Sequence, residues 1–171
     1  TSESTVLTQI DSEAGEGNHL WPQILPGNEA ALFTIWTTAP SWDESRIGVA
    51  DLETGQHRVV LEGGVSARYT PSGHLVFWRG GSLMAVAFDL DSLEVIGEPR
   101  VVVENVYLGG FNGDAHFAVS DTGTLAYVSG GLNFFFETSL VDRSGQELLR
   151  LDATAAVGDP TFSPDGSKVA L

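Results

Sequence analysis

The sequence contains no cysteine, and its basic residues are few. Without thiols the chain forms no disulfide and no cysteine-based zinc or iron–sulfur site. Eight Lys and Arg residues stand against 23 Asp and Glu residues, which gives a formal net charge of −15. This balance argues against binding nucleic acid through its phosphates and against docking on anionic lipid. It favours a chain whose copies repel one another in solution.

Long apolar runs are also missing, since none approaches the ~20 residues of a membrane-spanning helix. The chain begins at Thr1, with neither an initiator Met nor the pattern of a signal peptide, so we expect a mature form, an excised domain or an expression product. Glycine is abundant, with 20 residues, and 42% of the residues are hydrophobic. This composition indicates a globular chain with many turns.

A turn motif recurs along the chain at nearly regular intervals. It reads LPGN, TPSG, SDTG and SPDG, and its last residue is Asn28, Gly73, Gly123 and Gly166 in turn. Successive motifs lie 45, 50 and 43 residues apart. Pro sets φ and Gly or Asn accepts the left-handed conformation, so each motif predicts a tight turn. A repeat of about 40–50 residues is typical of propeller blades and similar arrays.

Each turn is expected to join two short strands, and two further strands complete each repeat. Apolar residues two apart precede the turn and a compact apolar run follows it, as in FAVSDTGTLAYV. Four antiparallel strands in each repeat predict an all-β propeller with three complete blades and a partial fourth. The predicted units are an orphan outer strand over 5–10, blades over 18–63, 64–106 and 113–152, and the first two strands of a partial blade over 157–171.

These repeats resemble the TolB-type β-propeller repeat, a WD-repeat-like blade whose SPDG turn joins the first two strands. PTFSPDGSKVAL at the carboxyl end matches its first hairpin, and VADLETG at Val49–Gly55 matches the exit of its third strand. HLWPQILPGNEAALFT and GVSARYTPSGHLVFW are similar to propellers attached to the extracytoplasmic end of some bacterial serine/threonine kinases. The resemblance implies a bacterial protein in the periplasm or outside the cytoplasm. It implies no kinase activity, because no kinase motif is present.

The resemblance implies closed rings of about six or more blades, which three and a half blades cannot form. An open array would expose the apolar faces of its terminal blades. We therefore expect either a piece of a longer propeller or a chain that completes a ring with other copies. We expect a homodimer in which the orphan strand pairs with the unfinished blade of another copy, because unpaired strand edges are usually protected. The expected contacts between copies are Val6, Phe134, Phe135, Phe136 and Leu171.

Propellers commonly bind partners where their innermost strands meet at the central channel. The candidate residues at this rim are His19, Trp21, Arg68, Tyr69, His116 and Asp159. Trp21 and Tyr69 would stack on a sugar or an aromatic group, and Arg68 would pair with a carboxylate. The alternative is that the two aromatic rings pack between blades.

The sequence predicts no catalytic residue, no metal and no cofactor. His19, His57, His74 and His116 lack a local metal-binding spacing, so a zinc or iron site would need residues far apart in the sequence to converge. Asp114 stands two residues before His116, but no serine lies in the G-x-S-x-G context of a nucleophile. The loop carboxylates are interpreted as solvated acids rather than as the paired acids of a glycosidase.

Two functions remain open. We favour a non-catalytic module that presents a face to a protein or peptide, because the repeat framework is complete and carries no catalytic constellation. The alternative is a propeller that binds a carbohydrate or small ligand, or acts as a glycan hydrolase or lyase, through the residues at the channel rim. A polar cluster around a pocket at the channel mouth would favour this alternative.

Overall fold

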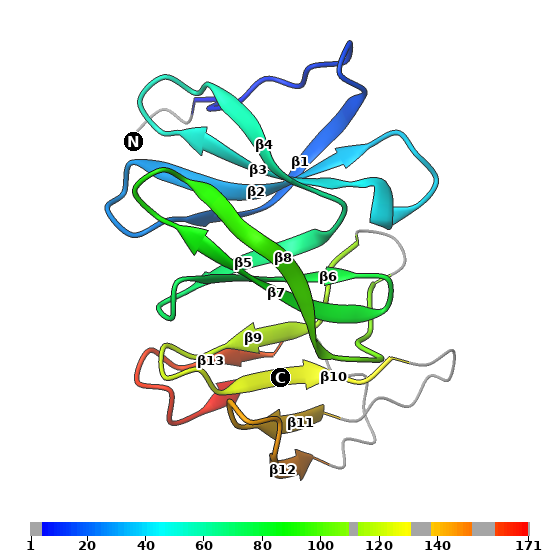
Figure 1. Cartoon of the computed structure of the whole chain (residues 1–171), viewed down its shortest axis with the longest axis vertical. Helices are drawn as coiled ribbons and strands as arrows, with labels where there is room; N and C mark the ends of the chain where they lie inside the picture. Colours follow the sequence, from blue (N-terminus) through cyan, green and yellow to red (C-terminus); the bar gives the residue numbers. More distant parts are fainter. Residues whose placement is uncertain (1–4, 110–112, 131–137, 152–159, 171) are drawn as a thin grey trace.

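The chain folds into three four-stranded antiparallel sheets and a further pair of strands (Figure 1). The computed structural model describes residues 5–109, 113–130, 138–151 and 160–170. The three large sheets follow one another along the long axis of the molecule, and each is a meander whose consecutive strands are neighbours. The predicted all-β class, with four-stranded propeller blades, is confirmed.

The elements follow the chain in order. The first blade contains β1 (Glu16–Ile24), β2 (Ala30–Thr37), β3 (Arg46–Asp51) and β4 (His57–Glu62). The second contains β5 (Val65–Thr70), β6 (His74–Arg79), β7 (Ser82–Asp89) and β8 (Glu94–Val103). The third contains β9 (Phe117–Val119), β10 (Leu125–Val128), β11 (Thr138–Val141) and β12 (Glu147–Leu151), and the last pair is β13 (Thr161–Phe162) and β14 (Val169–Ala170).

Helical structure is limited to one short turn in the part of the chain that the structure describes. This is the 3-10 helix η1 (Trp42–Glu44), which connects β2 to β3. Its first N–H groups are capped by Ser41, whose Oγ accepts a hydrogen bond from Asp43 N at 3.2 Å. Across the described ranges, no helix has the length and apolar content needed to cross a membrane.

Apolar strand faces form the core between neighbouring blades. Leu32 and Ile47 of the first blade pack with Leu75 and Phe77 of the second, and all four are fully buried. A second cluster, which includes Leu83 and residues of β9 to β11, joins the second blade to the third. Burying one such side chain stabilises the fold by about 1.5–3 kcal/mol. Packing between the sheets therefore holds neighbouring blades together.

The face of the first blade that points away from the second blade, here called the free face, is also buried. Phe33, Ile35 and Ala50 form a cluster there, and each is at most 4% exposed. Residues 5–15 run across this end of the molecule, in dark blue in Figure 1, and Arg46 Nη2 fastens them by donating to Ala14 O at 2.7 Å. The expectation of an exposed apolar face is therefore wrong for this blade, because the preceding segment covers it.

The segment over residues 5–10, for which the sequence predicts an orphan strand, is not a strand in the single chain. A strand is defined by its ladder hydrogen bonds, and these residues make none to the described sheets. They lie along the first blade instead, where Thr8 contacts His19. Pairing of this segment with another copy remains a prediction. The first blade itself begins at Glu16, two residues before the predicted boundary.

Candidate functional sites

The innermost strands of the blades meet at a cleft of about 510 Å³, here called the axial cleft. β1, β5 and β9 are each the end strand of a sheet, and residues of all three line the cleft together with residues of β13. An end strand pairs on one side only, so the edges of these strands are left without ladder partners on the cleft side. The axial cleft takes the place of a propeller's central channel.

Trp21 lies in the axial cleft on a bulge of β1. Its backbone is left-handed, with φ at 56°, and the register between β1 and β2 shifts between Leu20 and Gln23. The indole Nε1 is buried and has no hydrogen-bond acceptor among the described residues. A buried donor without a partner costs about 1–3 kcal/mol. A ligand or water that accepted this hydrogen bond would recover that free energy.

Arg68 and Tyr69 of β5 also line the cleft, and both are tied to β1. Arg68 Nη1 donates to Trp21 O at 3.2 Å. Gln23 bridges the two inner strands, because its Oε1 accepts from Tyr69 N at 2.7 Å and its Nε2 donates to Tyr69 O at 3.3 Å. The Tyr69 ring packs edge to face on Phe88, with centroids 6.1 Å apart. Phe88 belongs to the same blade, and Tyr69 also packs against the core cluster between the first and second blades while it lines the cleft.

The other three predicted rim residues have different places. His116 is not among the cleft-lining residues. It contacts Asp114 Oδ2 at 3.1 Å, and its ring lies edge-on to Tyr107. Asp114 itself lines the cleft, although the sequence did not single it out for the rim. Asp159 lies outside the described residues. His19 lies away from the cleft, on the free face of the first blade, so the cleft unites three of the six predicted residues.

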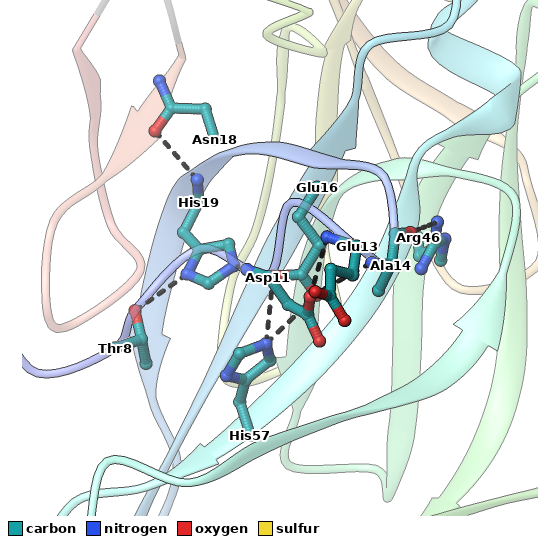
Figure 2. A network of polar contacts seen from close by, with 9 residues as sticks. All are labelled: Thr8, Asp11, Glu13, Ala14, Glu16, Asn18, His19, Arg46 and His57. Carbon is teal, nitrogen blue, oxygen red and sulfur yellow. Dashed lines mark hydrogen bonds and ion pairs between the residues drawn. The ribbon is translucent and has the colours of Figure 1, made fainter.

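Glu16, His19 and His57 converge on the free face (Figure 2). The first two come from β1, and His57 comes from β4 at the other end of the same sheet. His19 Nε2 is 3.1 Å from Glu16 Oε2, and His57 Nε2 is 3.1 Å from Glu16 Oε1. The Glu16 side chain is only 4% exposed, and the imidazoles are 12% and 16% exposed. We call these three residues the Glu–His–His cluster.

A bulge at Gly17 places Glu16 and His19 on the same face of β1. Successive residues of a strand face opposite sides, so residues three apart share a face only where one extra residue is inserted. The register between β1 and β2 shifts by one residue at this point. Glycine is needed there, because a Cβ at Gly17 would lie 2.5 Å from ring atoms of Trp36.

The segment before β1 holds the cluster from the other side. Asp11 N donates to Glu16 Oε2 at 2.8 Å, and Thr8 Oγ1 lies 2.8 Å from His19 Nδ1 (Figure 2). Burial raises the pKa of Glu16, but hydrogen bonds from Asp11 N–H, His57 and His19 together outweigh it. The pKa of Glu16 therefore lies below its ordinary value of 4.5, and the carboxylate is ionised near neutral pH.

Sequence reasoning missed the Glu–His–His cluster because its members are brought together by strand pairing. Glu16 and His57 are 41 residues apart. The histidines lack a local metal-binding spacing, as the sequence indicates, yet the fold directs two of them to one carboxylate. The available signal was that His19 and His57 fall within the first and last strands of the same predicted blade.

Meandering four-stranded sheets around an axial cleft define a β-propeller. No family model matches the chain, and no curated protein matches it. Among solved structures it is similar to TolB from Acinetobacter baumannii, with 25% identity, a TM-score of 0.60, and coverage of 91% of this chain and 37% of that one. It is also similar to regucalcin, a calcium-binding protein from Agrobacterium tumefaciens, with 15% identity and a TM-score of 0.62. That likeness covers 96% of this chain and 56% of regucalcin.

A third similar structure is a puromycin-hydrolysing peptidase of Mycobacterium tuberculosis, with 18% identity, a TM-score of 0.56, and coverage of 85% of this chain and 23% of that one. The chain thus spans 37% and 56% of the length of the first two structures. These likenesses support a TolB-like β-propeller fold. They do not select a function, because an enzyme stands among them, and the likeness to kinase-attached propellers remains a prediction.

Proposed function

We propose that the chain is a non-catalytic TolB-like propeller module that binds an extended peptide or protein segment in the axial cleft. The observation that carries this proposal is that the end strands of three blades line one cleft. Such edges bond readily to an added extended segment through the backbone groups that side chains do not already hold, as Gln23 holds the N–H and C=O of Tyr69. The Trp21 indole and the Arg68 guanidinium, both at the cleft, would donate to its carbonyl or carboxylate groups.

The hydroxyl groups of the cleft favour binding over catalysis. Ser66 and Ser120 line the cleft, but no histidine stands among its described lining residues to act as a general base. Ser66 Oγ is already engaged, since it donates to Gly113 O and accepts from Ala115 N, each at 3.1 Å. A serine hydrolase mechanism would require one of these groups to be both free and activated.

A peptide-display selection against the immobilised chain tests this proposal. The selected peptides are measured by calorimetry against the wild type, Trp21→Phe and Arg68→Ala, with Arg100→Ala on the exposed side of β8 as the charge-matched control. We expect Arg68→Ala and Trp21→Phe each to weaken binding at least about tenfold. Each variant removes one hydrogen bond, and a loss of about 1.4 kcal/mol corresponds to a tenfold change in affinity. Failure to select any peptide, or equal affinities for all four proteins, would contradict the proposal.

The size of the cleft favours a second candidate, a carbohydrate or another small ligand. Small-molecule sites typically measure about 300–1,000 Å³, and the axial cleft falls within that range. Trp21 would then stack on a sugar face, with Arg68 and Asp114 as polar partners. A thermal-shift screen of glycans separates the two candidates. A glycan that stabilises the wild type but not Trp21→Ala favours the second candidate, and release of reducing ends from it would indicate a glycan hydrolase or lyase.

We further propose that two copies assemble as a homodimer, in which the segment over 5–10 of each copy pairs with the unfinished blade of the other. β13 and β14 form only a two-stranded sheet within the described residues. Val6 is 86% exposed, so the single chain leaves this apolar side chain unused. The remaining predicted contacts, at Phe134 to Phe136 and Leu171, lie outside the described residues.

Light scattering tests the homodimer. We expect a mass of about twice the 18.2 kDa of one chain, and we expect Val6→Asp to shift the population toward the single chain. Ser2→Asp adds the same charge four residues earlier and is the matched control. A wild type that stays at 18.2 kDa at high protein concentration rules out the dimer.

A further inference from the structure

We propose that the Glu–His–His cluster is a binding site for a divalent transition-metal ion, most suitably zinc, on the free face of the first blade. The site is separate from the axial cleft and independent of the proposed peptide binding. Its ligands would be Glu16 through its carboxylate and both His19 and His57 through Nε2. Two imidazoles and one carboxylate form a ligand set that zinc uses in proteins, with a water in the fourth position.

The distances fit such an ion. Bonds of ~2.1 Å in a tetrahedral arrangement place the ligand atoms about 3.4 Å from one another. Each imidazole Nε2 lies 3.1 Å from an oxygen of Glu16, and the three ligand atoms all lie within 4.8 Å of one another. Both histidines already present the same nitrogen to the carboxylate. Small movements of the side chains would therefore complete the coordination without a change in the sheet.

The surroundings of the ligands are those that metal sites need. A ligating imidazole is usually oriented by a hydrogen bond at its other nitrogen, and Thr8 Oγ1 lies 2.8 Å from His19 Nδ1. The Asp11 N–H orients the carboxylate of Glu16. The Phe33 ring packs against both imidazoles, with centroids 4.7 Å from His19 and 5.8 Å from His57. This apolar neighbour limits the access of water to the three ligands.

The ligand types also select the class of ion. Calcium and magnesium prefer six or more oxygen ligands, and imidazole suits zinc, copper, nickel and iron instead. The buried carboxylate of Glu16 accepts hydrogen bonds but faces no Lys or Arg in this cluster, and a bound metal ion would give it a positive partner. Metal titration tests for that ion.

An ion at this position would fasten the covering segment. Thr8 and Asp11 bond to His19 and Glu16, the side chains that the metal would hold in place. Metal binding would therefore stabilise residues 5–15 on the apolar free face. Thr8 lies within the segment over 5–10 that the proposed homodimer pairs with another copy, so metal binding and that pairing would compete for this segment.

The full chain, without a histidine tag and after treatment with a chelator, is titrated with Zn²⁺ by calorimetry and with Co²⁺ by visible absorption. We expect one ion for each chain, the absorption of tetrahedral Co²⁺, and a thermal midpoint that rises with Zn²⁺. Glu16→Gln and His57→Gln should each weaken Zn²⁺ binding more than about 100-fold, since loss of an outer partner alone costs about 10–100-fold. His74→Ala, which removes an exposed histidine of β6, is the matched control and should bind as the wild type does.

Thr8→Ala keeps the test decisive if a ligand variant fails to fold, because it leaves all three ligands in place. We expect it to weaken Zn²⁺ binding about tenfold and to leave the far-ultraviolet circular dichroism unchanged. A wild type without any Zn²⁺-dependent shift in its thermal midpoint overturns the proposal. Equal Zn²⁺ affinity of the wild type and a folded Glu16→Gln also overturns it, and the cluster would then be a hydrogen-bonded network only.

Discussion

A single serine connects all three complete blades. Ser66 N donates to Thr34 Oγ1 of the first blade at 3.0 Å, and Ser66 Oγ bonds to Gly113 O and Ala115 N before the third blade, each at 3.1 Å. The backbone of Ser66 is left-handed, with φ at 55°, a conformation that costs a non-glycine residue about 1–2 kcal/mol. Trp21 occupies the matching position of the first blade with φ at 56°, so the bulge belongs to the repeat.

Removing the acceptor for Ser66 N–H should destabilise the chain. Thr34 is fully buried, and Thr34→Val keeps its shape while it leaves the Ser66 N–H without a partner. We expect the free energy of unfolding to fall by about 1–3 kcal/mol, measured by denaturant titration. Thr38→Val at an exposed position is the matched control and should change it by less than about 0.5 kcal/mol. Equal losses in the two variants would show that the hydrogen bond contributes nothing.

At the scale of elements, the turns between strands share one device. Asp51 and Asp89 each end the third strand of a blade. The Oδ1 atom of Asp51 accepts hydrogen bonds from the backbone N–H and the hydroxyl of Thr54. Asp89 Oδ1 accepts the same two hydrogen bonds from Ser92, which also lies three positions later. These donors hold the pKa of both carboxyls below its ordinary value of 3.8. Asp165 in the SPDG turn is a similar acceptor, but its donors lie two positions away on either side, and hydrogen bonds from Ser163 Oγ and from Ser167 N–H and Oγ lower its pKa to about 2.

These turns predict how the chain responds to acid. A carboxyl whose pKa is lowered by folding adds stability that is complete above its unfolded pKa and is lost as the pH falls through its folded pKa. For Asp165 the window runs from about 4 down to about 2. We expect the thermal midpoint to fall across that window, and to fall less steeply in Asp165→Asn than in the wild type. Glu98→Gln, at an exposed position of β8, is the control. If the thermal midpoint falls equally steeply with pH in the wild type and in Asp165→Asn, Asp165 does not contribute to the response to acid.

Sequence reasoning succeeded for these turns because their chemistry is local. Gly73, Gly123 and Gly166 all have the predicted positive φ, at 75°, 88° and 67°. It placed Trp21 at the inner rim but did not foresee the bulge there, because no residue type signals a bulge in which a bulky side chain takes the left-handed conformation. Nor did it foresee that residues 5–10 lie along the first blade in the single chain. Their apolar residues suit a strand, yet a strand needs a partner edge, which lies outside any local pattern.

At the scale of the whole molecule, charge and apolar surface oppose each other. The formal net charge of −15 makes copies of the chain repel one another. Val6, Ile10 and Leu148 are exposed by 86%, 49% and 58%, and burying them would favour association. The proposed homodimer therefore depends on whether apolar burial outweighs the repulsion between the two negatively charged chains. Added salt favours the dimer, because screening weakens the repulsion and leaves apolar burial intact.

Ionic strength should therefore promote the dimer. The Debye length falls from about 10 Å at 0.1 M salt to about 3 Å at 1 M, so the dimer fraction at fixed protein concentration should rise over that range. Sedimentation velocity in the presence of a chelator measures it without interference from bound metal. Val6→Asp should remain largely monomeric throughout, because it removes apolar contact and adds charge. A dimer that dissociates as salt rises would instead indicate an interface held by ion pairs, and the strand-exchange arrangement around Val6 would be wrong.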